Sequence, residues 1–257
     1  GSDGMDRWLN QIIEGDCLEV MKEIPDKSVD MILCDLPYGT TACEWDTIIP
    51  LESLWEQYER IIKPNGAIVL FGSQPFTSAL AMSNPSLFKY EWVWDKVKPS
   101  GHLNAKKMPM KQHENILVFG KGKIKYFPIM TEQQERISKN YLKNKTDIFG
   151  KEKQVERKTD KKYPKSIISF SNANQKNKIH PTQKPVALFE YLIKTYTNEG
   201  ETVLDNCIGS GTTAIACINT GRNFIGIEIE EKYVKIARER IEKHKKLDKM
   251  RLFPISE

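Results

Sequence analysis

The sequence has few cysteines and histidines, and none of them are spaced as metal ligands. Its five cysteines, at positions 17, 34, 43, 207 and 217, form no C-x-x-C pair, and its four histidines form no cluster with them. An odd number of scattered cysteines is typical of free thiols, not of a disulfide framework or a zinc site. We therefore expect neither a metal ion nor a disulfide.

Long apolar runs are absent as well. No stretch reaches the roughly 20 residues that a transmembrane helix needs, and no signal-peptide pattern is present. These absences predict a cytoplasmic protein with no membrane partner. Residues 1–4 are expected to be a cloning remnant before Met5, and the remaining length fits one large α/β domain with an insertion.

A carboxylate, a proline and an aromatic ring follow the first strongly apolar segment. Residues 29–34 predict a buried strand, and Asp35-Leu36-Pro37-Tyr38 comes directly after it. In open α/β sheets this carboxyl edge is where ligands bind. Asp35 and the carbonyl of Leu36 or Pro37 can accept the two hydrogens of an exocyclic base amine. Pro37 fixes the backbone, and Tyr38 can stack on a base taken out of a duplex. Alone, the tetrapeptide also fits an ordinary strand-to-turn connection.

A second pattern lies far downstream. Residues 201–205 predict a strand that runs into a turn with Gly209 and Gly211 and then into a helix, whose free N–H groups can face a ligand. The next strand, 223–227, ends at Glu228, which suits ribose hydroxyls. The turn is not G-x-G-x-x-G and has no basic side chain for a pyrophosphate. A nucleoside with a positive sulfonium therefore fits better than a dinucleotide, and a plain βαβ unit is the alternative.

A third pattern, His180-Pro181-Thr182-Gln183-Lys184-Pro185, opens a helix predicted over residues 186–193. Pro185 suits the first turn of that helix. Taken alone, His180 and Lys184 also fit a solvated loop. The segment is a candidate for the site only because it lies shortly before the strand that leads into the glycine turn.

Together these motifs resemble those of S-adenosylmethionine-dependent amino-group DNA methyltransferases. The catalytic motif comes first and the glycine turn last, as in the permuted β group of that family, in which a target-recognition region separates the two halves. One more segment, residues 13–17, is similar to the family's adenine contact, which points to Asp16. The resemblance extends from about Asn10 to Ile241. It implies a Rossmann-like α/β fold, a mostly parallel sheet with helices on both faces and a basic recognition insertion.

The resemblance also implies site residues and a reaction. It implies direct methyl transfer from S-adenosylmethionine to the N6 amine of an adenine flipped out of double-stranded DNA, with S-adenosylhomocysteine as product. The catalytic residues would be Asp35, Leu36, Pro37 and Tyr38. The cofactor-binding residues would be Asp16, Cys17, Asp35, His180, Lys184, Pro185, Asp205, Asn206, Cys207, Gly209, Gly211, Thr212, Thr213 and Glu228.

Two positions depart from the family pattern. Leu36 stands where proline is common, and it should contribute mainly its backbone. Asn206-Cys207 stands where Pro-Phe is usual, and we expect this change to bear on cofactor affinity because the family's aromatic packs near the methionine end. Asp35 favours adenine, since the cytosine enzymes of the family more often carry serine there.

Positive charge is concentrated in one block. Residues 121–179 hold 16 Lys and Arg against 6 Asp and Glu, a net charge of +10, whereas the whole chain carries +5. This block has interleaved aromatics and no long helical or strand periodicity. We interpret it as a DNA-contacting insertion, with a solvated lysine loop as the alternative. The lysines expected to bind DNA are Lys151, Lys153, Lys161, Lys162 and Lys165.

The chain is thus expected to comprise a catalytic half (5–120), a target-recognition insertion (121–179) and a cofactor-binding half (180–250). Periodicity further predicts helices over 51–62, 76–82 and 230–246 and strands over 67–71, 90–96 and 114–119, with a turn at 64–66. The last helix is expected to pack on the sheet as scaffold. The loop from Pro99 to Lys111 is either a segment that closes over DNA or an ordinary hairpin connection.

Other functions stay open at this point. Within the class, the product could be N4-methylcytosine or the substrate RNA. From another class, the chain could be a non-catalytic nucleic-acid-binding protein, whereas a nicotinamide dehydrogenase is disfavoured by the glycine pattern. A homodimer and a restriction endonuclease partner are both open.

Overall fold

The computed structural model describes residues 4–39, 47–143, 152–172 and 183–252, with the backbone alone for 133–143 and 152–159. The chain divides into two compact units, one formed by residues 1–127 with 166–257 and the other by residues 128–165.

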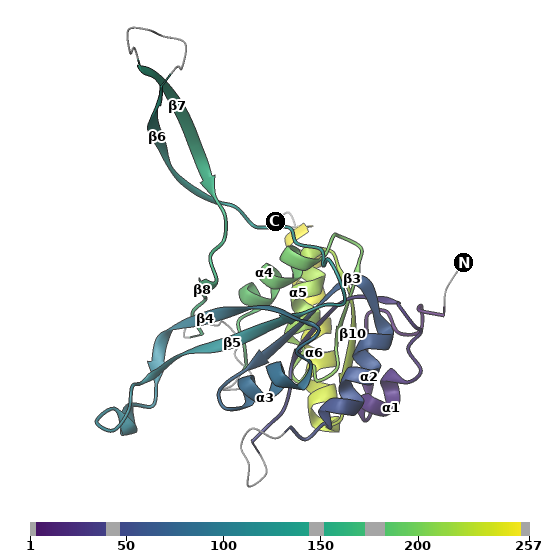
Figure 1. Ribbon diagram of the computed structural model, residues 1–257. Coiled ribbons are helices and arrows are strands. Elements are labelled where there is room, and N and C mark those ends of the chain that lie inside the picture. Colours follow the sequence, from purple (N-terminus) through teal and green to yellow (C-terminus); the bar gives the residue numbers. More distant parts are fainter. Residues whose placement is uncertain (1–3, 40–46, 144–151, 173–182, 253–257) are drawn as a thin grey trace, which may run out of the picture. The chain divides into compact units, whose positions relative to one another are not determined.

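The larger unit is built on an eight-stranded, mostly parallel sheet (Figure 1). Strands β1, β10, β9, β2 and β3 are parallel neighbours, β5 runs antiparallel to both β3 and β4, and β8 is parallel to β4. In sheet order the strands are β1 (Gln11–Glu14), β10 (Asn223–Glu228), β9 (Thr202–Asp205), β2 (Val29–Asp35), β3 (Ile62–Gly72), β5 (Lys111–Phe119), β4 (Phe88–Ser100) and β8 (Ile167–Ser169). The predicted α/β class is confirmed.

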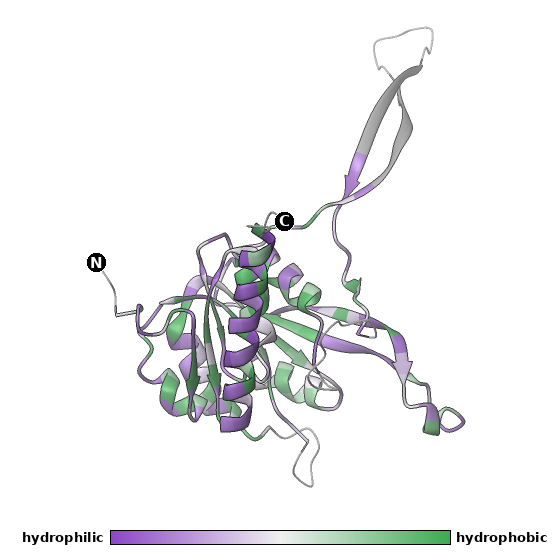
Figure 2. Cartoon of the chain, turned by 180° about the vertical axis from the view of Figure 1, so that it is seen from behind, coloured by the Kyte–Doolittle hydropathy of each residue, from purple (hydrophilic) through white to green (hydrophobic). Residues whose placement is uncertain are grey.

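Helices cover both faces of this sheet because its central strands are apolar on both sides. In β2, Ile32 and Cys34 pack with α1 (Cys17–Met21), α2 (Leu51–Ile61) and α3 (Phe76–Ser83). Met31 and Leu33 point to the other face and pack with α4 (Val186–Tyr196), α5 (Thr212–Thr220) and α6 (Glu231–Leu252). Figure 2 shows hydrophobic strands behind α6, which presents a largely hydrophilic outer surface.

Most predicted elements are found within a few residues of their expected bounds, with one exception near α2. Residues 64–66 do not form a turn but lie inside β3, where the pairing with β2 shifts register between Val29 and Met31. Such a bulge accommodates Pro64, which cannot donate to a regular ladder. The Pro99–Lys111 segment forms the end of the β4–β5 hairpin, with a short 3-10 helix, η1 (His102–Asn104), at its tip.

The smaller unit contains an element that the sequence did not predict. Strands β6 (Thr131–Lys143) and β7 (Glu152–Lys162) pair antiparallel as a two-stranded ribbon. The lack of strand periodicity in this block therefore did not exclude strands. A two-stranded ribbon needs no apolar face, so alternation is not required. Residues of opposite charge instead face each other in register, as Glu132 and Lys161 do.

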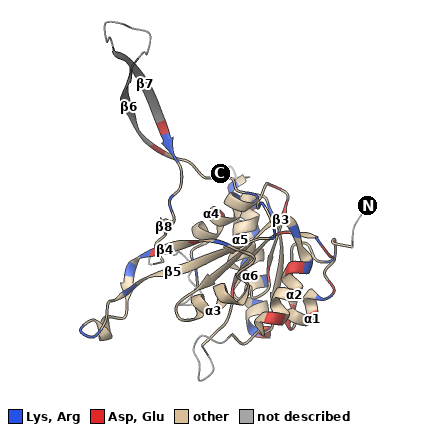
Figure 3. Cartoon of the chain, in the orientation of Figure 1, with Lys and Arg blue, Asp and Glu red and all other residues tan. Residues whose placement is uncertain are grey.

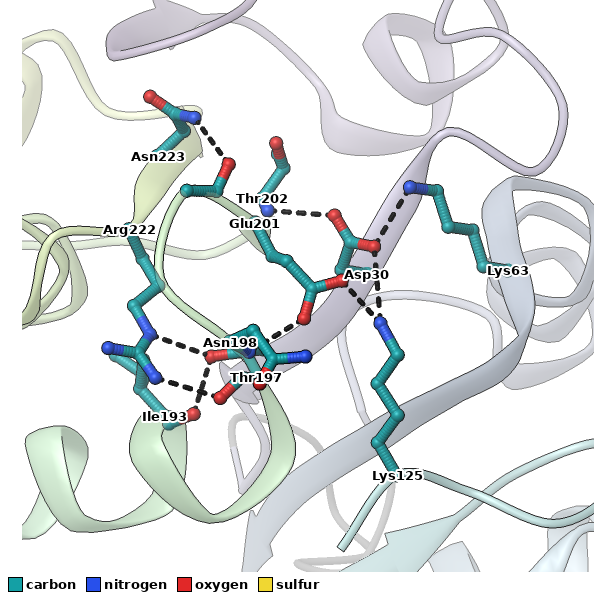
Figure 4. A network of polar contacts seen from close by, with 11 residues as sticks. Asp30, Lys63, Lys125, Ile193, Thr197, Asn198, Glu201, Thr202, Arg222 and Asn223 are labelled. Atoms are coloured by element: carbon teal, nitrogen blue, oxygen red, sulfur yellow. Dashed lines mark hydrogen bonds and ion pairs between the residues drawn. The ribbon is translucent and has the colours of Figure 1, made fainter. Parts of the chain in front are cut away.

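A buried ionic cluster ties the amino-terminal ends of three strands together (Figure 4). Asp30 of β2 accepts hydrogen bonds from Lys63 Nζ of β3 at 2.8 Å and from the Thr202 backbone of β9 at 2.9 Å. Lys125 pairs with Asp30 and with Glu201. Burial by itself raises the pKa of Glu201, but the hydrogen bonds from Lys125 and a backbone N–H lower it below its usual value. This cluster lies at the sheet edge opposite the carboxyl ends of the strands.

The described part of the chain bears on three features: disulfides, metal sites and membrane-spanning helices. Four cysteines, at positions 17, 34, 207 and 217, are free thiols, whereas Cys43 lies outside the described residues. Among the described residues there is no group of His, Cys, Asp and Glu suited to a metal ion, and none of the described helices is both long and apolar enough to cross a membrane.

Candidate active site

The carboxyl edge of the sheet brings together acidic residues that are distant in sequence. Asp35 ends β2, Asp205 ends β9 and Glu228 ends β10. Among the described residues, a cavity of about 310 Å³ and one of about 160 Å³ adjoin this edge, and Asp35, Cys207, Gly209 and Tyr233 line both. Asp35 therefore stands where the two spaces meet.

Asp35 is held by a lysine that lies two residues before the start of α4. Lys184 Nζ donates to Asp35 Oδ2 at 2.5 Å, and the side chain of Lys184 is 11% exposed whereas that of Asp35 is 43% exposed. The same ammonium group lies 5.3 Å from the centre of the Phe71 ring. Burial lowers the pKa of Lys184, but the charges of Asp35 and Glu114 outweigh that effect and raise it. The lysine is thus charged, and Asp35 keeps Oδ1 for another donor.

The rest of the Asp35–Tyr38 motif is ordered by nearby side chains. Leu36 is buried in the core. The Pro37 carbonyl accepts from Thr47 Oγ1 at 2.8 Å and from the Ile48 backbone at 3.4 Å. Tyr38 stacks on Phe76 with ring centres 4.5 Å apart, and burial raises the pKa of its hydroxyl. The ring is half-buried, so its orientation is set before any base arrives.

The larger cavity is acidic at one end. Asp16 caps α1, where its Oδ1 accepts from the Leu18 backbone at 2.9 Å. Glu228 is 8% exposed, and its two carboxylate oxygens accept from the backbone N–H groups of Gly209 and Glu230, each at 2.9 Å. Cys17 also lines this cavity, as do Ile48 and Ile49. Carboxylates beside an apolar wall suit a nucleoside with free hydroxyls.

The smaller cavity contains Asp205, which is 4% exposed. Burial raises the pKa of Asp205 to about 7, although hydrogen bonds from Thr213 Oγ1 at 2.5 Å and the Cys207 backbone at 3.0 Å oppose the rise. A buried carboxylate is costly without a partner, and a bound cationic group would favour its ionised form.

The turn after β9 packs closely on its surroundings. Asn206 is buried and accepts a hydrogen bond from the Tyr58 hydroxyl at 2.5 Å, while its amide donates to the thiols of Cys17 and Cys207. A hydrogen bond from Cys207 lowers the pKa of Cys17. Gly211 has φ +92°, and a Cβ there would lie 3.2 Å from Ala237 Cβ, so glycine is required.

Not every expected site residue is in the walls of these cavities. Gly211 caps α5 and Pro185 precedes α4, and neither contributes to the lining of the two cavities. His180 and Lys151 lie outside the described residues, and Lys153 is described by its backbone alone. Lys161, Lys162 and Lys165 belong to the smaller unit, where they are exposed. Thr212 lines the smaller cavity beside Thr213.

Three contributors were missed by sequence reasoning. Tyr233 of α6 was interpreted only as scaffold, but it lines both cavities. Thr47 holds Pro37, and Phe76 supports Tyr38. Helical spacing reveals which face of a helix is buried, but not that its first turn overhangs a cavity. An aromatic residue four positions after the end of β3, at the start of α3, was the available signal for Phe76.

Comparison with known proteins is consistent with this arrangement. The DNA methylase family of N6 and N4 amino-methyltransferases matches residues 29–239. The chain is 33% identical over 259 residues to the type II methyltransferase M.BglII of Bacillus subtilis, covering 89% of this chain and 68% of that protein. It is 27% identical over 248 residues to the type II methyltransferase M.HpaI of Haemophilus parainfluenzae, covering 90% and 74%.

Solved structures show the same fold. The M1.HpyAVI–SAM complex has a TM-score of 0.62 and 29% identity, with 90% of this chain and 98% of that chain covered. The cytosine-N4-specific PvuII DNA methyltransferase has a TM-score of 0.65 at 16% identity, covering 93% and 91%, and this likeness concerns the fold alone. The chain belongs to the DNA methylase family of S-adenosylmethionine-dependent amino-methyltransferases.

Proposed function

We propose that this DNA methyltransferase transfers the methyl group of S-adenosylmethionine to the N6 amine of adenine in double-stranded DNA. The observation that carries the proposal is the position of Asp35, at the junction of the two cavities with Oδ2 bound to Lys184. A carboxylate fixed in this way has one oxygen directed by an ion pair and one available to a substrate.

The residues present fit the cofactor. Asp16 and Glu228 in the larger cavity suit the adenine and ribose, and Asp205 in the smaller cavity suits the cationic methionine end. When bound, S-adenosylmethionine supplies a methyl group activated by a sulfonium. Lys184 is compatible with that positive charge because Asp35 and Glu114 balance it.

The chain's own residues would act on the amine. Asp35 Oδ1 accepts a hydrogen bond from one N–H of the amine, and a backbone carbonyl accepts a hydrogen bond from the other N–H. These two bonds direct the nitrogen lone pair toward the methyl donor. The Pro37 carbonyl already accepts two hydrogen bonds, from Thr47 and Ile48, so the Leu36 carbonyl is the better acceptor. No covalent bond to the enzyme is needed.

Tyr38 would receive the flipped base. Phe76 covers the Tyr38 ring at 4.5 Å with nearly parallel planes, which fixes the tyrosine as a platform. Stacking of a base on a pre-oriented aromatic recovers part of the free energy lost when the base leaves the duplex.

The choice of adenine over cytosine rests on Asp35 and remains part of the proposal, since the family includes N4 enzymes. Duplex DNA as the substrate is supported by the relatives, which are called type II methyltransferases. The same name supports a restriction endonuclease partner. A homodimer and a cytoplasmic location stay predictions.

Methylation of plasmid DNA by the purified protein, followed by modification-aware sequencing, tests the proposal. We expect N6-methyladenine at one short recurring sequence. Unmodified DNA, or a methyl group on cytosine, would refute the proposed reaction or its base.

A further inference from the structure

The β4–β5 hairpin extends past the carboxyl edge of the sheet, on the same side as Asp35. Phe71 of β3 pairs with Asp35 on one side and with Ile116 of β5 on the other, so these three residues lie at the same position along the strand direction. The hairpin continues from Ile116 for five more residues to Lys111, which pairs with Ser100. At about 3.4 Å per residue the paired strands reach about 17 Å beyond the level of Asp35, before the tip begins.

This extension is basic throughout. Residues 96–113 contain five lysines and no aspartate or glutamate, a net charge of +5 with histidine neutral, which equals the net charge of the whole chain. Figure 3 shows this basic character along the distal part of the hairpin. The acidic residues that flank the segment are engaged at its base: Asp95 accepts from Gln112, and Glu114 pairs with Lys96 at 3.2 Å.

The tip is ordered and presents an apolar side chain. Gly101, at φ +87°, starts η1, and backbone hydrogen bonds from Asn104 to Gly101 and from Met108 to Asn104 close the turn. Leu103 in η1 is 101% exposed, the highest value among the large hydrophobic residues whose side chains the structure describes, and Met108 is 57% exposed. Leu103 is thus an aliphatic side chain fully in water on a hydrogen-bonded turn whose charges are all positive, with the partly exposed Met108 in the same turn.

We propose that this hairpin is a DNA-contacting arm and that Leu103 is a wedge that enters the base stack beside the flipped adenine. The inference rests on the proposed function. The lysines match the phosphates on both sides of a groove, and an apolar residue inserted between base steps is a known means of unstacking a duplex. The arm is separate from the basic 121–179 block, which the sequence associates with target recognition.

The reach of the hairpin fits this role. A base held at Asp35 leaves its duplex on the solvent side of the carboxyl edge, and the arm runs along that side from two strands away. Neighbouring strands lie about 4.8 Å apart, so the arm is offset from Asp35 by about 10 Å. Leu103 would then contact the stack at the step from which the base departs.

A wedge role predicts a dependence on base pairing that a structural role does not. Leu103→Ala should slow single-turnover methylation of a fully paired duplex, carrying the site found by sequencing, by at least about tenfold, because the cost of opening a pair is a few kcal/mol. The same variant should approach the wild-type rate when the target base is mismatched, since that base is already unstacked. Leu252→Ala, at an exposed position on α6, is the matched control and should match the wild type on both duplexes.

The lysines provide an independent measurement. Lys106→Gln with Lys107→Gln should weaken duplex binding and flatten the slope of log affinity against log salt, whereas Lys243→Gln with Lys246→Gln on α6 should not. An unchanged slope for the hairpin variant would contradict contact with phosphates.

Other outcomes separate this inference from the function on which it rests. Leu103→Ala at the wild-type rate on the paired duplex, or slowed equally on both duplexes, would overturn the wedge alone. A change in the sedimentation mass of Leu103→Ala would assign the tip to contact between copies of the chain and also overturn it. A wild-type protein that methylates neither duplex would overturn the proposed function and the wedge together.

Discussion

Glu228 is the residue at which the cofactor site can be tested most sharply. Its carboxylate is nearly buried, and it accepts backbone hydrogen bonds from Gly209 and Glu230 while it lines the larger cavity. Each carboxylate oxygen can accept more than one hydrogen bond, so the group can shape the glycine turn and hold ribose hydroxyls at once. Glu228→Ala removes both interactions.

The two losses have different magnitudes and different readouts. Loss of a charge-assisted hydrogen-bond pair to the ribose is expected to cost about 2–3 kcal/mol, which weakens S-adenosylmethionine binding about 30- to 150-fold. Release of two buried backbone N–H groups should separately lower the free energy of unfolding by about 1–3 kcal/mol. Glu228→Gln keeps one acceptor oxygen and should fall between the wild type and the alanine variant.

Calorimetric titration with S-adenosylmethionine measures the first loss, and thermal unfolding without cofactor measures the second. Glu242→Ala, at an exposed position on α6, is the control and should change neither. Unchanged affinity in a folded Glu228→Ala protein would refute the assignment of Glu228 to the cofactor, whatever its effect on stability.

Three further predictions concern pH, stability and DNA affinity. Because the pKa of Asp205 is raised to about 7 when folded, its carboxylate ionises as pH rises from 6 to 8, so S-adenosylmethionine should bind more tightly over that window in the wild type and show no such dependence in Asp205→Asn. Between about pH 4 and pH 7 the folded protein keeps a proton on Asp205 that the unfolded chain has lost. The contribution of Asp205 to the free energy of unfolding therefore falls as pH rises over this window, and unfolding measured from about pH 4 to pH 7 checks the sign. Asp30→Ala leaves Lys63 and the Thr202 N–H without their buried acceptor and should lower the free energy of unfolding by about 2–4 kcal/mol in denaturant titration, with an unchanged midpoint contradicting the role of the cluster. Replacement of four lysines by glutamine should flatten the salt dependence of DNA binding if the 121–179 block contacts phosphates; the four are Lys151, Lys153, Lys161 and Lys162.

The sequence was sufficient for the parts of the molecule that depend on local patterns. Apolar runs predicted β2, β9 and β10, and the acidic residues at their carboxyl ends could be placed at one edge because parallel strands share that edge. The glycine turn was recognisable for a similar reason, since Gly211 occupies a backbone conformation and a close packing position that other residues do not tolerate.

The interactions that the sequence did not reveal are those between distant segments. Lys184 lines the smaller cavity, and its contact with the cofactor stays a prediction. Its ion pair with Asp35 spans 149 residues of sequence, and no local pattern encodes that pairing. Tyr233 looked like one more residue of a helix face, because periodicity reports which side of α6 is buried but not what its first turn covers. The β6–β7 ribbon was missed because the sequence of residues 131–143 and 152–162 has no regular apolar alternation.

Nucleoside mass spectrometry of duplex DNA treated with the protein and S-adenosylmethionine tests the central claim most directly. The account predicts N6-methyladenine with the wild type, and at least about a hundredfold less with Asp35→Ala, whose cofactor binding should stay near the wild-type value. N4-methylcytosine without N6-methyladenine would contradict the choice of base. Methylation confined to RNA would contradict the substrate, and near wild-type turnover by Asp35→Ala would contradict the assignment of Asp35 as the acceptor of the amine hydrogen.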